Sequence, residues 1–363
     1  LDDRNGATWR MNLDTGIAER SRLAMRPPQQ PEACGRCHAR RGVIRDEYEY
    51  GKPLAHTHRP ALLQEPLYFS DGQIRDEVYV YGSFLQSRMY QAGVTCGDCH
   101  EPHSASLRTG SAPSDICSTC HLPEKFAATD HHGHADDTVA CVDCHMTSRD
   151  YMVVDGRRDH SFRVPRPAIS AAVGSPDACS GCHTDRDTGW IAESFAALFG
   201  DEHPPHYGTA IHAGRTGGGN APLLAAIANP DYPGIARATA LTLLRPPYSQ
   251  RAAEAIQAAS NSGDPLLRLA ALRAMPGLQQ ELQLQWASNL LNDPVRGVRI
   301  EAARHLSPMR AQLHVQVEPV FARAETELLD SINAIAERPE AQINLGNLLA
   351  ESGDISGSEA AFR

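Results

Sequence analysis

The stretch Cys141-Val142-Asp143-Cys144-His145 holds two cysteines separated by two residues and followed directly by a histidine. This pattern occurs five times and uses all ten cysteines of the 363-residue chain. Chance would give roughly 0.01 such patterns at this composition. The cysteine pairs are Cys34/Cys37, Cys96/Cys99, Cys117/Cys120, Cys141/Cys144 and Cys179/Cys182, and the histidines after them are His38, His100, His121, His145 and His183.

A Cys-X-X-Cys-His sequence is typical of covalent haem c attachment. The two intervening residues coil into a short helical turn, so both thiols reach one edge of the porphyrin and the next residue directs its imidazole at the iron. A zinc ion needs four ligands and does not require a histidine after every pair. A redox dithiol is expected once, near a strand–helix pattern. We therefore predict five covalent haem c groups, with the five motif histidines as proximal iron ligands.

Each iron needs a sixth ligand, and the chain has 17 histidines. This surplus favours a second histidine at each iron, which gives lower potentials than a histidine–methionine pair. His103 is too close to His100 to serve the same haem, so we expect it to bind a neighbouring one. One member of the group His131, His132 and His134 is expected to bind, and His212 is an alternative to His206. The candidate distal ligands are His58, His103, His160, His206, His131, His132, His134 and His212.

The region around the motifs is rich in proline, glycine, aspartate and histidine, with little sustained periodicity. We expect residues 1–33 to form a connecting segment and residues 34–215 to form a pentahaem domain of short helices and loops, whose core is made largely by the haems. Within it, Glu77–Tyr81 alternates and predicts a short strand. The arginines around His160 could pair with haem propionates; they are Arg157, Arg158, Arg163 and Arg166.

Residues 214–221 indicate a linker, after which the composition changes to alanine, leucine and arginine. Three similar stretches follow, at residues 229–244, 262–275 and 292–306, each with an aspartate near a proline before apolar residues at helical spacing. Aspartate can cap the free amides of a helix and proline suits its first turn. We predict HEAT-like helical repeats over 219–320 and the start of a tetratricopeptide repeat over 321–363. The alternative is an ordinary helical bundle.

The overall balance of residues narrows the class of protein. The net charge of −10 argues against nucleic-acid binding, and no apolar run is long enough for a transmembrane helix. Only Lys52 and Lys125 are lysines among the 34 basic residues. Haem is joined to cysteine outside the cytoplasm, so we expect a periplasmic or extracellular protein whose targeting signal is missing from this sequence.

The motifs in combination resemble the multihaem c-type cytochromes that carry C-terminal tetratricopeptide repeats. The resemblance rests on the stretches that begin at Cys34, Gly93, Ala140 and Ser175, with Thr57–Leu63 and the helical tail. The haem part is similar to the cytochromes of nitrogen metabolism, which implies a mostly α fold, stacked haems and bis-histidine ligation. Further haem motifs upstream of this sequence are implied as well.

Electron transfer along closely packed haems, with the helical repeats docking redox partner proteins, is the leading hypothesis. A first alternative is the electron-transfer part of an octahaem nitrite or hydroxylamine oxidoreductase, although no Cys-X-X-Cys-Lys motif is present. A second alternative is a subunit of an extracellular cytochrome filament that associates with itself through haems or repeats. The sequence favours an electron carrier over a catalyst, and no catalytic residue is predicted.

Overall fold

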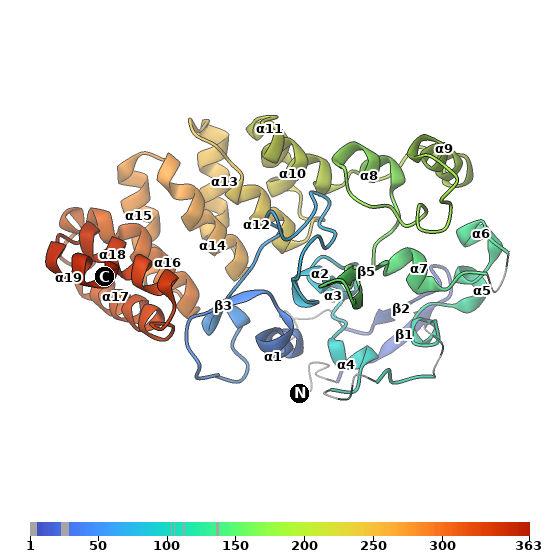
Figure 1. Ribbon diagram of the computed structural model, residues 1–363, viewed down its shortest axis with the longest axis horizontal. Helices are drawn as coiled ribbons and strands as arrows, with labels where there is room; N and C mark the ends of the chain where they lie inside the picture. The colour runs from blue at the N-terminus through green and yellow to red at the C-terminus, as the bar shows by residue number, and fades with distance from the viewer. Residues whose placement is uncertain are drawn as a thin grey trace. The chain divides into compact units, whose positions relative to one another are not determined.

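The computed structural model describes residues 6–22, 29–102, 104, 106–110, 112, 114–135 and 138–363. The chain forms two compact units. Unit 1 consists of Leu1–Ala39 and Leu63–His212, and unit 2 consists of Arg40–Leu62 and Ala213–Arg363. The fold is mostly helical with small two-stranded sheets (Figure 1). Among the described helices, none combines the length and apolar character needed to cross a membrane.

Unit 1 has two antiparallel hairpins, β1 (Trp9–Asn12) with β2 (Ile17–Arg20), and β5 (Ser148–Tyr151) with β6 (Asp155–Arg158). Most of its helices have only one or two turns. They are α1 (Gln29–His38), α2 (Tyr81–Phe84), α3 (Arg88–Gln91), α4 (Cys96–Cys99), η2 (Cys117–Thr119), α5 (Pro123–Phe126), α6 (Thr129–His132), α7 (Cys141–His145), α8 (Pro167–Val173), α9 (Thr188–Phe199) and α10 (Tyr207–Thr216), the last of which continues into unit 2.

The strand predicted over Glu77–Tyr81 is wrong. Tyr79 has φ of 60°, in the left-handed region, which no extended strand can contain. Only an isolated bridge between Tyr79 and Ala39 forms there, and α2 begins at Tyr81. The segment is irregular, with Val78 and Tyr81 buried and the residues between them half-buried.

The interior of unit 1 mixes apolar and polar side chains. Leu63, Tyr68 and Ile211 are fully buried, and the carboxylates of Asp71 and Asp159 are buried as well. Burial is the largest cause of the raised pKa of Tyr68. Buried carboxylates are stable only when they are paired or hydrogen-bonded, so this interior depends on specific polar contacts.

Unit 2 contains one small hairpin and a run of helices. The hairpin joins β3 (Arg41–Val43) to β4 (His58–Pro60), with η1 (Leu54–His56) between them. The helices are α11 (Asn220–Ala228), α12 (Gly234–Thr242), α13 (Gln250–Ser260), α14 (Pro265–Ala274), η3 (Met275–Gly277), α15 (Gln280–Leu290), α16 (Arg296–Leu306), η4 (Ser307–Gln312), α17 (Glu318–Asn333), α18 (Pro339–Glu351) and α19 (Ile355–Phe362).

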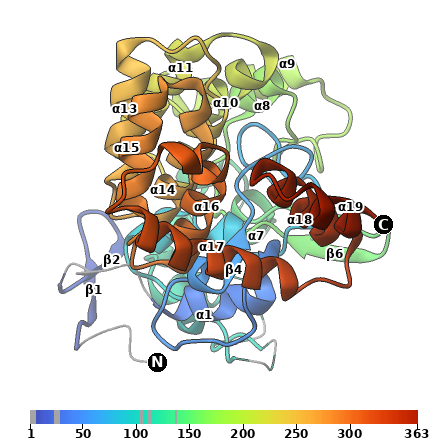
Figure 2. The ribbon, with the colours of Figure 1, turned by 90° about the vertical axis from the view of Figure 1, so that its left-hand side faces the viewer.

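These helices pack in two rows. In one row α12 contacts α14 and α14 contacts α16, while in the other α11 contacts α13 and α13 contacts α15. Figure 2 shows α13 and α15 side by side. The first row is formed by the three stretches that resemble one another in sequence. The predicted cap is confirmed at Asp264, whose side chain accepts from the Leu266 N–H at 2.8 Å, with Pro265 in the first turn.

Segment 40–62 is held in unit 2 by the start of α16. The Arg296 N–H donates to Nδ1 of His56 at 3.2 Å, which satisfies one of the free amides at the helix start. Gly297 faces the segment, and a Cβ there would stand 2.4 Å from the carbonyl oxygen of Ala55. Only glycine allows this close approach. Segment 40–62, which lies between the first two cysteine pairs in sequence, thus packs against α16.

The side chains of Arg268 and Asp293 form a buried ion pair between α14 and the loop before α16. The guanidinium donates to both carboxylate oxygens, at 2.6 and 2.9 Å, and the two side chains are 10 % and 4 % exposed. Asp293 also accepts from the Val295 N–H at 2.8 Å. We predict that Asp293→Ala lowers the unfolding free energy by about 3–5 kcal/mol, because it leaves a buried guanidinium without its partner.

The measurement is urea denaturation of the full chain followed by far-ultraviolet circular dichroism. Glu337→Ala is the control, since it breaks the exposed contact between Glu337 and Arg338 and should cost less than about 1 kcal/mol. Similar losses in the two variants would contradict the assigned role of the buried pair.

Candidate haem-binding site

Each cysteine-pair motif is coiled into a tight turn. The histidine N–H donates to the carbonyl of the first cysteine at 2.9 Å in the motifs that begin at Cys96, Cys117 and Cys179. The first and fourth motifs close α1 and form α7. A single turn of helix places both thiols and the imidazole on neighbouring positions, as covalent haem attachment requires.

Aspartates fix the start of several of these turns. The carboxylate of Asp98 accepts from the Thr95 N–H at 2.8 Å, and that of Asp143 accepts from the Ala140 N–H at 2.9 Å. Asp177 accepts from the Cys179 N–H at 2.7 Å. Such bonds satisfy the amides that a helix start leaves free, so the motif turns are specified locally by their own sequences.

All ten cysteines are free thiols, and successive motifs approach one another through them. The thiols of Cys34 and Cys96 are hydrogen-bonded, which lowers the pKa of Cys34 to about 7 and raises that of Cys96. Cys117 and Cys141 form a second such pair, in which the hydrogen bond lowers the pKa of Cys141 to about 5.

The second cysteines make the intervening links. Cys99 interacts electrostatically with Cys120, and Cys144 with Cys182. Hydrogen-bonded first cysteines therefore relate motif one to motif two and motif three to motif four, while electrostatic interactions that involve Cys99 and Cys144 relate motif two to three and motif four to five. The five motifs form one continuous series in sequence order.

Cys37, the second cysteine of the first motif, departs from the enclosed setting that a core made largely of haems predicts. It is exposed at the end of α1, as is Cys182 in the last motif, whereas the other eight cysteines are half-buried. The physical reason is its place in the series: the first motif has a single neighbouring motif, which it meets through Cys34. The side of the turn that carries Cys37 therefore faces solvent, and its thioether role stays a prediction.

Three motif histidines face a second histidine from elsewhere in unit 1. Ring centroids are 6.3 Å apart for His100 and His160, 6.0 Å for His145 and His131, and 6.0 Å for His183 and His134. Two imidazoles bound to opposite sides of one metal, with metal–nitrogen bonds of about 2.0 Å, have centroids about 6 Å apart. These pairs have the separation that a bis-histidine iron needs.

Hydrogen bonds distinguish which rings leave Nε2 available. Nδ1 lies 2.5 Å from the Arg163 carbonyl in His145, 2.9 Å from the Arg158 carbonyl in His160, and 2.6 Å from the His132 carbonyl in His134. Because a carbonyl only accepts, the proton is on Nδ1 and Nε2 keeps its lone pair. This is the usual arrangement behind a metal-bound histidine.

Two other candidate histidines have the opposite arrangement. In His132, Nδ1 accepts from the His134 N–H at 3.2 Å, and Nε2 lies 3.3 Å from the Ala127 carbonyl. In His206, Nδ1 accepts from the Gly208 N–H at 3.0 Å. An accepting Nδ1 puts the proton of a neutral ring on Nε2, so these rings do not present a free Nε2 lone pair.

The remaining candidates lie in varied surroundings. His58 is on β4 of unit 2, is 5 % exposed, and has Nδ1 2.9 Å from the Thr57 hydroxyl. His212 is half-buried on α10. His103 lies outside the described residues. The proximal candidate His121 packs against the ring of Phe126 at 5.5 Å.

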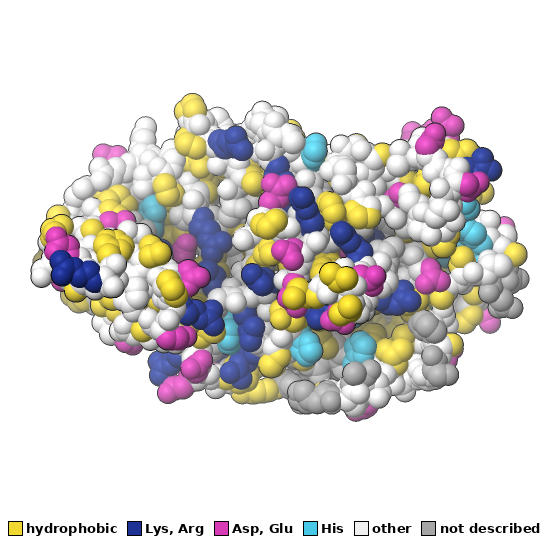
Figure 3. Space-filling model, in the orientation of Figure 1, with side chains coloured by type: hydrophobic (Ala, Val, Ile, Leu, Met, Phe, Trp, Pro, Cys, Tyr) yellow, Lys and Arg dark blue, Asp and Glu magenta, His cyan; other side chains and the backbone are white. Residues whose placement is uncertain are grey.

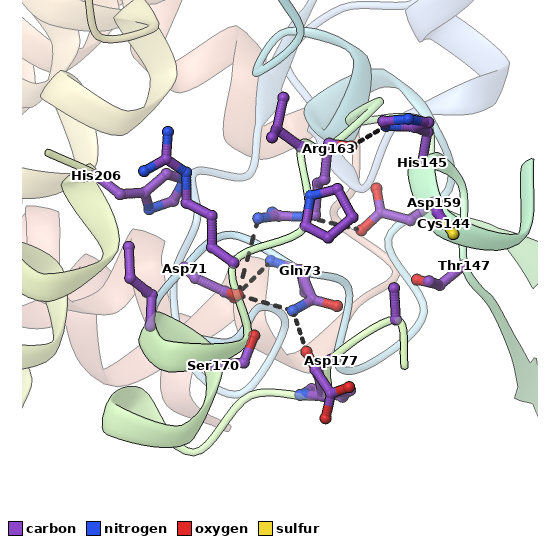
Figure 4. A pocket seen from close by; sticks show the side chains of 16 residues that line it. Asp71, Gln73, Cys144, His145, Thr147, Asp159, Arg163, Ser170, Asp177 and His206 are labelled. Carbon is purple, nitrogen blue, oxygen red and sulfur yellow. Dashed lines mark hydrogen bonds and ion pairs between the residues drawn. The ribbon is translucent and has the colours of Figure 1, made fainter. Parts of the chain in front are cut away.

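A cavity beside the fourth motif is lined by both charged and motif side chains. Figure 4 shows Arg163 between Asp71 and Asp159, with Cys144 and His145 on one side and His206 on the other. Although burial opposes ionisation of Asp71, the charge of Arg163 and three hydrogen bonds lower its pKa. Sequence reasoning identified Arg163 but missed Asp71, which no local pattern relates to it, and also missed Asp159, which lies only four residues before Arg163.

The arginines around His160 are paired with carboxylates or carbonyls in unit 1. Arg157 binds Asp155 at 2.6 Å, Arg158 lies 3.7 Å from Asp143, and Arg166 donates to the Pro204 carbonyl at 2.7 Å. Basic and acidic side chains are interspersed on the face shown in Figure 3. The expected pairing of these arginines with haem propionates stays a prediction.

No family model and no curated protein matches this chain. It is similar to a solved structure titled "Crystal Structure of Outer Cell Wall Cytochrome OcwA", with 18 % sequence identity and a TM-score of 0.36, over 69 % of this chain and 64 % of that one. The chain thus spans less than two thirds of the length of that structure. Its own cysteine pairs are consistent with haem c attachment.

His206 should make folding pH-dependent. Burial is the largest cause that lowers its pKa to about 4, followed by the charge of Arg163. In the unfolded chain the His206 imidazole is protonated as the pH falls below about 6.5, whereas in the folded chain it is protonated only near pH 4. Stability is therefore complete above pH 6.5 and falls as the pH is lowered toward 4, by about 2 kcal/mol at pH 4.5.

The measurement compares urea denaturation at pH 7.5 and pH 4.5 for the haem-loaded chain and its His206→Gln variant. Glutamine does not titrate, so the variant should lose less stability than the parent on acidification. An equal loss in both proteins would show that His206 titrates normally in the folded state.

Proposed function

We propose that this chain is a multihaem c-type cytochrome that carries electrons along five haems. The observation that supports it best is the continuous series of motifs, in which each Cys-X-X-Cys-His turn meets the next through a cysteine. Thiols joined to haem vinyl groups at these positions would bring neighbouring haem edges close together. When bound, each haem supplies a one-electron iron couple.

The protein's own groups hold and saturate the irons in this proposal. His38, His100, His121, His145 and His183 are the proximal ligands. His160 faces His100, His131 faces His145 and His134 faces His183 at the separations given above. Of these rings, His145, His160 and His134 have the Nδ1 hydrogen bond that leaves the Nε2 lone pair available. His58 and His103 remain candidate distal ligands and are not assigned to a particular iron. With both faces of every iron occupied, electron transfer is favoured over catalysis at an open site.

Residues 219–320, with α11–α16, are proposed to be HEAT-like repeats, and residues 321–363, with most of α17 and all of α18 and α19, the beginning of a tetratricopeptide repeat. The two rows of packed helices support this interpretation, as does Gly346, which lets α18 approach the ring of Phe362 on α19. Repeats of this kind commonly bind proteins on an extended surface. We propose docking of a redox partner there, in the periplasm or outside the cell, since thioether attachment of haem takes place beyond the cytoplasmic membrane.

The experiment that tests the proposal combines mass spectrometry with a redox titration followed by electron paramagnetic resonance. The expected mass is that of the polypeptide plus five haems, and all five irons should be low-spin. A mass equal to the bare polypeptide would refute haem attachment. A high-spin iron would favour the catalytic alternative instead.

A matched pair of variants tests the ligand assignment. His134→Ala should convert one of the five low-spin irons to high-spin, because it removes the imidazole that faces His183. His132→Ala should leave all five low-spin, because both nitrogens of that ring already have other hydrogen-bond partners. Electron paramagnetic resonance of the oxidised proteins separates these outcomes, and the reverse result would exchange the two assignments.

A further inference from the structure

A buried arginine in unit 1 lies between two buried carboxylates. The guanidinium of Arg163 is 3.8 Å from Asp71 and 3.8 Å from Asp159, and the three side chains are 16 %, 5 % and 8 % exposed. Asp71 also accepts from Gln73 and from the hydroxyl of Ser175, each at 2.7 Å. We refer to Arg163, Asp71 and Asp159 as the charge cluster. With one positive and two negative charges, it carries a net charge of −1.

The charge cluster is joined to the fourth motif through the backbone of Arg163. The Arg163 N–H donates to the His145 carbonyl at 3.0 Å, and Nδ1 of His145 donates to the Arg163 carbonyl at 2.5 Å. The cavity beside it is lined by Cys144 and His145 together with all three members of the cluster (Figure 4). These two bonds fix both the chain and the ring orientation of His145.

Ions that are held so close to a ligand and away from water act on it through a low effective dielectric. Carboxylates favour the more positive, oxidised iron, whereas a guanidinium favours the reduced one. The two carboxylates outnumber the single guanidinium. Arg166, Asp177 and His206 also line the cavity. The charges of Arg166 and Asp177 have opposite signs, and the lowered pKa of His206 leaves its ring neutral near pH 7.

We propose that the charge cluster positions His145 and lowers the reduction potential of the haem joined to Cys141 and Cys144. This inference rests on the proposed function, since it concerns a haem at that motif. The residues act through His145 and through their charge, so they are positioning residues and not iron ligands. The cluster thereby gives this haem a lower reduction potential than it would have without the two carboxylates.

Charge-changing variants with opposite expected signs test the proposal. Asp71→Asn removes a negative charge and should raise the reduction equilibrium constant of one haem tenfold or more, which is 59 mV for a one-electron couple. Arg163→Gln removes the positive charge and should shift the same component downward. Arg163→Lys keeps the charge and should leave that component close to its parent value even if packing suffers.

The measurement is spectroelectrochemical titration of the haem-loaded full chain, with the haem content of each variant checked by mass. Asp150→Asn is the matched control, because it makes the same charge change on the exposed strand β5 and should move no component. Shifts of equal sign in Asp71→Asn and Arg163→Gln, or no shift in either, would overturn the inference. Failure of the proposed function is distinguished by a parent protein that carries no haem.

Discussion

The packing of five cysteine-pair turns within one small unit is the constraint on which unit 1 depends. Three of the turns are closed by a hydrogen bond from the histidine N–H to the carbonyl of the first cysteine, and two pairs of neighbouring turns are joined by hydrogen-bonded thiols. Between them there is too little chain to build an apolar core around each motif. Between the second and fifth motifs the helices are short, because each motif turn is soon followed by the next.

The two units are stabilised in different ways. In unit 2 the fully buried side chains include Leu241, Ile256 and Leu328, and burial of that kind contributes about 25 cal/mol for each Å² of apolar surface. In unit 1 bonded polar groups such as the charge cluster share the interior with buried apolar side chains. Covalent cofactors in such an interior would supply the apolar surface that the polypeptide lacks, so folding and cofactor attachment are expected to be coupled.

Sequence alone predicted the features that are encoded locally. The cap at Asp264 and the three similar stretches that become α12, α14 and α16 follow from short-range spacing. The strand predicted over Glu77–Tyr81 is wrong because alternating residue types do not fix φ, and Tyr79 lies in the left-handed region. Neither Asp71 nor the hydrogen bonds that distinguish His132 from His134 could be predicted, since both depend on contacts that only the folded chain makes. The exposure of Cys37 could not be predicted either, because the motif sequence does not show which of its cysteines will lie against another motif.

Segment 40–62 shows how far such long-range contacts reach. By sequence it lies between the first two cysteine pairs, yet its residues Leu54 and Ala55 are buried within unit 2. The His56 imidazole accepts from the Arg296 N–H at the start of α16, and the absence of a side chain at Gly297 leaves space for the backbone at Ala55. The conformation around His58, a proposed iron ligand on β4, is therefore set by helices more than two hundred residues later. The helices of unit 2 thus fix the local structure around a proposed haem ligand.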